Sequence, residues 1–210
     1  MGKINNVFTC WAVTFLLILS AGCSYIAPGE SEKDLVPISS IGILPAQTSG
    51  HLPSKSPTMA ELEIGAETIN SLLENYFQSY TNVSLISQNK LEGLPSAKSG
   101  KYLSLAREAG QHLQYDAVLV TSVERYQDRK GSEYSVKAPA SVAFSLKLLA
   151  VVSGEVIWSA DFDQTQQPLL ENILPKSRST GSGFHWLTAA ELTSAGLTKK
   201  LNSCPYLKRD

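Results

Sequence analysis

Two aspartates in the second half of the chain are spaced so that they could do chemistry together. Asp161 and Asp163 lie in a stretch where apolar and polar residues alternate, and in a β-strand positions i and i+2 share one face. Paired carboxylates can perform general acid–base catalysis or bind a cation. The same alternation places Trp158 and Phe162 on the opposite face, which favours a solvated acidic face over a catalytic one.

The other residue types that bind metals or carry catalysis are scattered. None of His51, His112 and His185 has a partner at a metal-ligand spacing, and no H-E-x-x-H, C-x-x-C or G-x-S-x-G motif occurs. TGSGF at 180–184 lacks the spacing and the lysine of a P-loop, and ERYQDRK at 124–130 mixes charges as a solvated turn does. We therefore expect no catalytic residue, no metal, no cofactor and no enzymatic activity, and a hydrolase is the least favoured alternative.

A cysteine near the start of the chain has a more specific context. The 13 residues Val7–Leu19 are apolar except for two threonines, with Lys3 before them and small residues at 20–22. This run is too short for a spanning helix, which needs about 20 residues, and it has the anatomy of a signal peptide. Ser20–Cys23 resembles the bacterial lipobox, whose cysteine is acylated and becomes the new N-terminus. The alternative is an ordinary secretory signal with a chance cysteine at the cleavage site.

The lipobox pattern implies a cellular location for the protein. Each buried acyl CH₂ contributes about 0.8 kcal/mol, so several chains (palmitate among them) on Cys23 would hold the protein at a membrane. Ser24, rather than aspartate, in the second mature position implies the outer membrane, with the domain in the periplasm. Removing 22 of 210 residues leaves 188, and losing Lys3 changes the net charge from −1 to −2. Such a chain suits one domain and has no basic surplus for nucleic acid.

The remaining cysteine and the segment after the lipobox complete this organisation. Cys10 would leave with the signal, so Cys204 has no partner for an intramolecular disulfide, and a free thiol is favoured over pairing between chains. Residues 23–38 contain Pro28, Gly29 and Pro37 and few bulky apolar residues. We interpret them as a lipidated tether that leads to a single domain at 39–210.

The domain is predicted to begin with the order β-α-β-α-β. Thr58 and Glu61 form a capping-box pattern at the start of the first helix, and the second helix is expected to turn Leu103, Ala106 and Leu113 inward. This order is typical of parallel strands joined by helical crossovers. The predicted strands are 41–44, 82–87 and 116–126, and the predicted helices begin at Thr58 and at about 100, the second ending near 113.

Two further elements are predicted to follow. Residues 142–148 and 156–162 alternate with period two around Ser153-Gly154, which indicates an antiparallel hairpin. Thr188 and Glu191 form a second capping box at the start of a C-terminal helix, where Leu187 and Leu192 are placed as a hydrophobic staple. The expected fold class is α/β, with a mixed sheet made of β-α-β-α-β, an antiparallel hairpin and a C-terminal helix.

Aromatic residues just before the last helix are the candidate contact site. Phe184, Trp186 and Leu187 lie together at its start. Tryptophan combines an apolar body with a polar N–H group, so an exposed Trp186 would suit a partner subunit or the membrane interface. Burial of Trp186 in the core is the alternative that the pattern leaves open.

The lipobox, the element order and the hairpin sequence together resemble a known group. SLKLLAVVSGEVIWS at 145–159 has a strand, a turn at Gly154 and a strand bearing Trp158, similar to outer-membrane lipoproteins of the CsgG, LpoB and PelC type. The resemblance covers mainly residues 40–165 and implies an α/β domain related to the N-terminal domain of TolB. It also implies a binding or assembly role, through a homo-oligomer or an envelope protein partner. The open alternatives are a PelC-like ring-forming accessory of exopolysaccharide export and an activator of a peptidoglycan synthase.

The anchor can be tested at Cys23. Cys23→Ser removes the thiol that would be acylated, so the variant should incorporate no labelled fatty acid and should no longer float with membranes in a density gradient. Absence of label from the wild-type chain would show that the signal is an ordinary secretory one.

Overall fold

The described residues of this computed structural model are 37–48, 57–98, 101–132, 135–166 and 186–207. They contain one mixed sheet of β1 (Ile41–Ile43), β2 (Gln47–Thr48), β3 (Val83–Leu85), β4 (Ala117–Gln127), β7 (Ser141–Ala150) and β8 (Val156–Thr165). The strand order is β3-β1-β4-β7-β8, and β2 pairs with β4. β1 lies parallel to β3 and β4, whereas β7 is antiparallel to β4 and β8. The signal peptide, Cys23 and nearly all of the tether lie outside the described residues.

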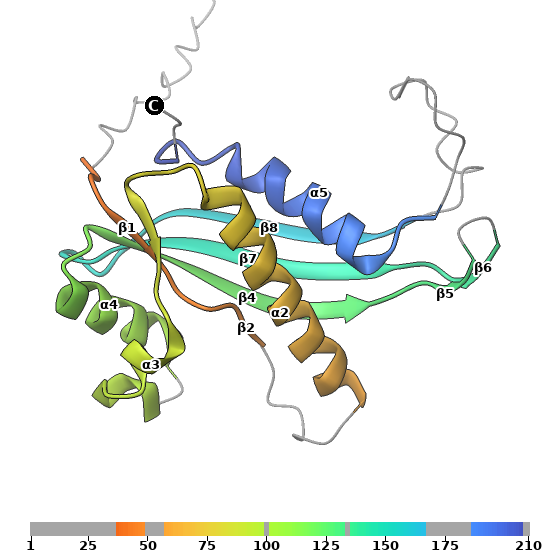
Figure 1. Cartoon of the computed structure of the whole chain (residues 1–210), viewed down its shortest axis with the longest axis horizontal. Helices are drawn as coiled ribbons and strands as arrows, with labels where there is room; N and C mark the ends of the chain where they lie inside the picture. The colour runs from red at the N-terminus through yellow and green to blue at the C-terminus, as the bar shows by residue number, and fades with distance from the viewer. Residues whose placement is uncertain (1–36, 49–56, 99–100, 133–134, 167–185, 208–210) are drawn as a thin grey trace, which may run out of the picture. The chain divides into compact units, whose positions relative to one another are not determined.

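Helices cover the two faces of this sheet unequally (Figure 1). On one face lie α2 (Pro57–Phe77) and α5 (Ala189–Leu201), and on the other lie α3 (Gln88–Leu91), the 3₁₀ helix η1 (Pro95–Lys98) and α4 (Tyr102–Leu113). The predicted α/β class, the order β-α-β-α-β, the hairpin and the C-terminal helix are confirmed. A small second sheet, β5 (Lys130–Gly131) paired with β6 (Val136–Ala138), was not predicted.

Two details of the predicted helices are wrong. α2 begins at Pro57 rather than after Thr58, so Thr58 lies inside the first turn and cannot act as its cap. Proline suits the first helical position because the missing N–H would have had no partner there. In α4, Leu103 is 41% exposed, while Leu105, Ala106 and Ala109 are buried. The buried stripe is therefore turned away from Leu103, and Leu113 borders it half-buried.

The first half of β4 is buried on both sides, and this divides the core into two clusters. Leu119 and Val123 belong to the cluster under α2 and α5, while Val118 and Val120 belong to the cluster under α4. Such a strand reads as a continuous apolar run because both of its faces are covered. The apolar face predicted for α2 is confirmed: its residues are buried or half-buried at Leu62, Gly65, Ala66, Ile69, Leu72, Leu73 and Tyr76.

α5 packs closely against the hairpin and is firmly held at its start. A Cβ atom added at Gly196 would stand 2.7 Å from the ring of Phe162, so only glycine allows this approach. The predicted capping box is present, with the Glu191 N–H donating to Thr188 Oγ1 at 3.2 Å.

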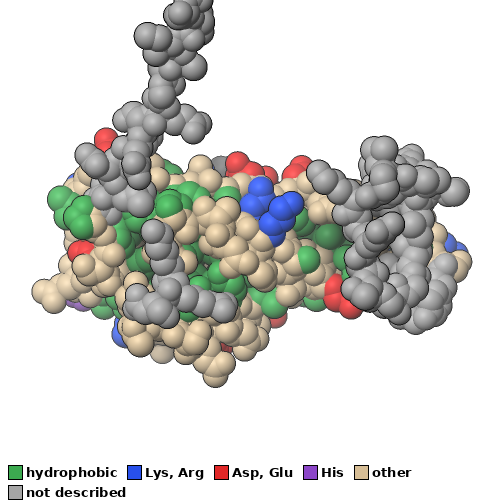
Figure 2. All heavy atoms as spheres, turned by 90° about the horizontal axis from the view of Figure 1, so that it is seen from above, with side chains coloured by type: hydrophobic (Ala, Val, Ile, Leu, Met, Phe, Trp, Pro, Cys, Tyr) green, Lys and Arg blue, Asp and Glu red, His purple; other side chains and the backbone are tan. Residues whose placement is uncertain are grey.

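The face along which α5 lies carries a group of lysine or arginine side chains among polar and hydrophobic ones (Figure 2). Basic side chains suit the end of α5, whose last turn carries Lys199 and Lys200.

Asp116 ties the start of β1 to the start of β4. Its Oδ2 accepts hydrogen bonds from the N–H groups of Ser39 and Ser40, at 2.9 and 3.0 Å, and from Ser40 Oγ at 3.1 Å. The bond from the Ser39 N–H is the largest cause that lowers the pKa of Asp116, the Ser40 donors add to it, and partial burial acts in the opposite direction. Folding therefore favours the charged carboxylate at this junction.

The sign of this shift predicts how stability depends on pH. Because the pKa of Asp116 is lower in the folded chain than the value of about 3.9 in an unfolded chain, its contribution is complete above about pH 4 and is lost as the pH falls further. Asp116→Asn should therefore be less stable than wild type at pH 7, and the difference between their free energies of unfolding should shrink as the pH falls from about 4 towards 2. A gap that stays constant over that range would contradict a role for the charge.

Candidate functional site

The aspartate pair lies on an open face of the hairpin. Asp161 and Asp163 are both exposed on β8, while Phe162 between them is buried on the opposite side. Asp163 forms an ion pair with Arg125, and the side chains of these residues are 70% and 34% exposed. The interpretation of a solvated face is thus confirmed, and such an exposed pair contributes at most about 1 kcal/mol.

The candidate contact residues before α5 are only partly described. Phe184 lies outside the described residues, and Trp186 and Leu187 are half-buried, Leu187 against the core cluster under α2 and α5. Their backbone is fixed, because Arg129 donates to the Trp186 carbonyl and the Leu187 N–H donates to Gln166 Oε1 at 2.8 Å. The contact role of these residues stays a prediction.

The charged segment 124–130 has a structural role that the sequence did not reveal. Asp128 Oδ1 accepts a hydrogen bond of 2.8 Å from the N–H of Ala189, the first residue of α5. Together with the bond from Arg129 to Trp186, this contact joins the end of β4 to the start of the last helix. Asp128 and Arg129 of this segment therefore help to position the start of α5, which follows some 60 residues later in the sequence.

Among the described residues, no group of three His, Cys, Asp or Glu side chains lies close enough to hold a metal ion. In the same part of the chain no helix has the length and apolar character needed to cross a membrane. His112 is exposed near the end of α4, and His51 and His185 lie outside the described residues. Cys204 is buried and forms no disulfide with another described residue, and burial raises the pKa of its thiol. Its preference for a free thiol over pairing between chains stays a prediction.

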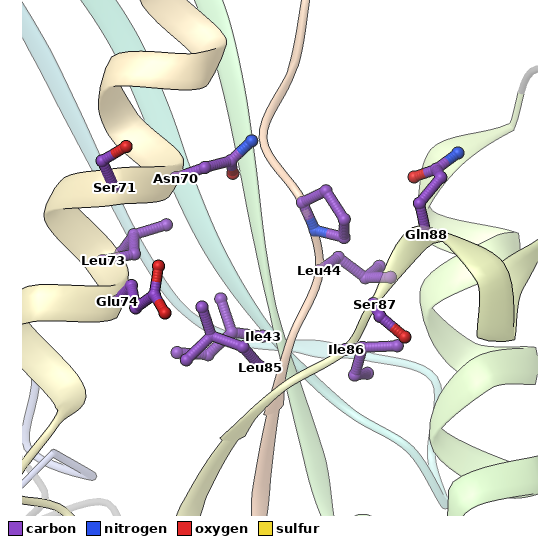
Figure 3. Close-up of a pocket in the computed structure, with 11 residues that line it drawn as sticks. Ile43, Leu44, Asn70, Ser71, Leu73, Glu74, Leu85, Ile86, Ser87 and Gln88 are labelled. Atoms are coloured by element: carbon purple, nitrogen blue, oxygen red, sulfur yellow. The ribbon is translucent and has the colours of Figure 1, made fainter.

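A hollow lies where the parallel strands β1 and β3 end. It has a volume of about 310 Å³ and lies between α2 and the segments that follow the two strands. Figure 3 shows Asn70, Leu73 and Glu74 of α2 on one side and Leu44 and Gln88 on the other. The described residues that line it are Ile43, Leu44, Pro45, Asn70, Ser71, Leu73, Glu74, Leu85, Ile86, Ser87 and Gln88.

A second hollow of about 500 Å³ continues the first along α2. The two share Pro45, Asn70 and Gln88, so they form one groove, which we call the α2 groove. Its second part is lined by β2 and by the first half of α2. The residues added there are Ala46, Gln47, Thr48, Glu63, Ala66 and Glu67.

Hydrogen bonds fix the wall of this groove at Pro45 and Ala46. Asn70 Oδ1 accepts from the Ala46 N–H at 2.7 Å, which ties α2 to the chain that leaves β1. On the other face of the sheet, the Tyr102 hydroxyl donates to the Pro45 carbonyl. Burial raises the pKa of Tyr102, so this hydroxyl remains protonated and keeps donating at physiological pH.

The α2 groove combines negative charge with hydrogen-bonding amides. Glu63, Glu67 and Glu74 are exposed along it, and none of the described residues that line it is a lysine, arginine or histidine. The sequence reasoning missed this site. The usable signal was the spacing of Glu63, Glu67, Asn70 and Glu74, four, three and four residues apart, which puts them on one side of a helix.

Neither a protein-family model nor a curated protein sequence matches the chain. It is similar to solved structures of the PelC and LpoB type, at low sequence identity. The PelC dodecamer from Paraburkholderia phytofirmans is 14% identical, with 84% of this chain and 92% of that chain covered and a TM-score of 0.48. The LpoB C-terminal domain from Salmonella enterica is 21% identical over 63% and 87%, with a TM-score of 0.38. Lipoprotein GNA1162 from Neisseria meningitidis is 17% identical over 79% and 98%, with a TM-score of 0.38.

The contact role of Trp186 can be separated from a core role by one substitution. If Trp186 contacts a partner, Trp186→Ala should weaken self-association or partner binding, by tenfold for each 1.4 kcal/mol lost, and should leave thermal unfolding nearly unchanged. Leu192→Ala is the control for a core substitution and should lower the melting temperature, because Leu192 is buried in the core cluster under α2 and α5. A stability loss of about 3–5 kcal/mol for Trp186→Ala, with association intact, would assign Trp186 to the core.

Proposed function

We propose that this chain is a lipid-anchored accessory protein of the bacterial outer membrane, which acts in the periplasm by binding other proteins in envelope assembly or export. The observation that carries the proposal is the signal-like run Val7–Leu19 followed directly by Ser20–Cys23. An acylated cysteine would hold the domain at the membrane surface, where it could act on neighbouring proteins without a spanning helix.

The organisation after Cys23 supports the same role. Residues 24–38 separate the cysteine from Ser39, which lies just before β1, and a chain of that length reaches at most about 55 Å when extended. The domain would therefore work within a limited zone near the membrane. Asp116 holds the first residues of the fold at Ser39 and Ser40, so the tether would join the central strand at a fixed point.

Binding rather than catalysis is the second part of the proposal. The paired carboxylates Asp161 and Asp163 face solvent on an open sheet face, with Arg125 as the ion-pair partner of Asp163. A catalytic pair would need a cavity that holds a substrate, and neither hollow of the α2 groove includes Asp161 or Asp163. A ring-forming accessory of polymer export and an activator of a wall-building enzyme are two finer versions of this role. A native mass measurement on the acylated protein distinguishes a ring from a monomer.

Complementation of a deletion strain tests both parts of the proposal. The wild-type chain and the double variant Asp161→Asn/Asp163→Asn should restore the envelope phenotype equally, because exposed carboxylates can be changed at a cost of about 1 kcal/mol or less. Cys23→Ser should fail at equal expression, because the domain is no longer held at the membrane. Loss of function in a folded double variant would contradict the non-enzymatic role, and full activity of Cys23→Ser would contradict the anchored one.

A further inference from the structure

We propose that the α2 groove binds an extended, basic segment of a partner protein. The inference deepens the proposed function, on which it rests for the partner being a protein, and it assigns the recognition surface to Glu63, Glu67 and Glu74 and the chain opposite them. Three features of the described residues lead to it: the divergence of the chain after β1 and β3, a row of exposed carboxylates and a preformed wall.

The first feature is the course of the chain at the ends of β1 and β3. After β1 the chain proceeds to α2 on one face of the sheet, and after β3 it turns to α3 on the other face. Ligands in α/β sheets bind in the crevice that opens where neighbouring connections diverge in this way. The α2 groove lies at this point (Figure 3).

The same geometry leaves residues 45–48 beside the groove. β3 ends at Leu85, whereas the chain continues from β1 into β2, which pairs with β4 alone among the described strands. The Pro45 carbonyl and the Ala46 N–H are already bonded to Tyr102 and Asn70, so these backbone groups are not available to a partner strand. An extended peptide in the groove would therefore be held mainly by side chains that line it.

The second feature is charge. None of Glu63, Glu67 and Glu74 forms an ion pair with another described residue, although all three are exposed. The row from Glu63 to Glu74 covers 11 residues of helix, about 16 Å, which equals the length of roughly five residues of extended chain. Two or three lysine or arginine side chains on such a segment could each face a carboxylate.

The floor of the groove suits the rest of such a segment. Leu85 is 43% exposed beside the buried Leu73 and Ile86, and its apolar side chain can cover the hydrocarbon stem of a lysine or arginine. The side chains of Ser87 and Gln88 can bond to peptide groups, and the amide nitrogen of Asn70 stays available because its oxygen holds Ala46. Mixed lining of this kind fits a peptide better than a bare cation.

The third feature is that the wall is already in place. The bonds from Ala46 to Asn70 and from Tyr102 to Pro45 hold residues 45 and 46 from both faces of the sheet. A preformed site loses less conformational entropy on binding, so moderate electrostatic attraction is enough to give measurable affinity.

A peptide titration tests the inference on the full acylated chain in nanodiscs of zwitterionic lipid. The probe is a fluorescein-labelled nonapeptide of alternating lysine and leucine, read by anisotropy. Wild type should bind it, more weakly as salt rises from 50 to 200 mM. Glu67→Gln/Glu74→Gln should weaken binding at least tenfold. The control Glu124→Gln/Glu155→Gln removes the same charge from exposed residues outside the groove and should change binding less than twofold.

The same titration would also show whether the groove binds something other than a basic peptide. Equal losses in the two double variants, no binding by wild type, or equally tight displacement by the small cation spermine would each overturn the peptide groove. These results leave the proposed function intact if Cys23→Ser still fails to complement. Conversely, peptide binding in the groove together with full complementation by Cys23→Ser would retain the groove and reject the anchored function.

Discussion

Burial of β4 on both faces is the constraint on which the rest of the structure depends. A strand that carries Val118, Leu119 and Val120 in succession needs helices on each side of the sheet. The chain meets this need by sending α2 to one face and α4 to the other, on either side of β3. The divergence of these two connections opens the α2 groove, so the core that stabilises the domain also creates the surface that we propose for recognition.

Much of this arrangement follows from local patterns. The period-two alternation predicted the hairpin, and the spacing of Thr188 and Glu191 predicted the start of α5, because both signals come from neighbouring residues. The groove could not be predicted in that way, since its lining comes from segments around 45, 70 and 87 that meet only through the topology. Leu103 shows a related limit: helical spacing allows two adjacent stripes, and packing against the sheet selects the one without Leu103.

Polar contacts between distant segments join the two ends of the domain to its centre. Asp116 holds the residues that lead into β1, and Asp128, through the N–H of Ala189, holds the first residue of α5. Both aspartates flank β4, so the segment that would arrive from the membrane and the helix that completes the core are attached to the same central strand. If residues 24–38 act as a tether, a domain attached in this way would present a fixed surface to a neighbour, because the fold would set the geometry of binding and the tether its reach.

The central claim is that a membrane-held domain recognises another protein through the α2 groove. Photocrosslinking in living cells measures this most directly, with a photoreactive amino acid placed at Gln88 in the groove and, as a control, at Lys147 on the exposed part of β7. The account predicts a discrete protein adduct from Gln88 in the membrane fraction, which Glu67→Gln/Glu74→Gln reduces, and no such adduct from Lys147. The same adduct from both positions, or none from Gln88, would contradict it.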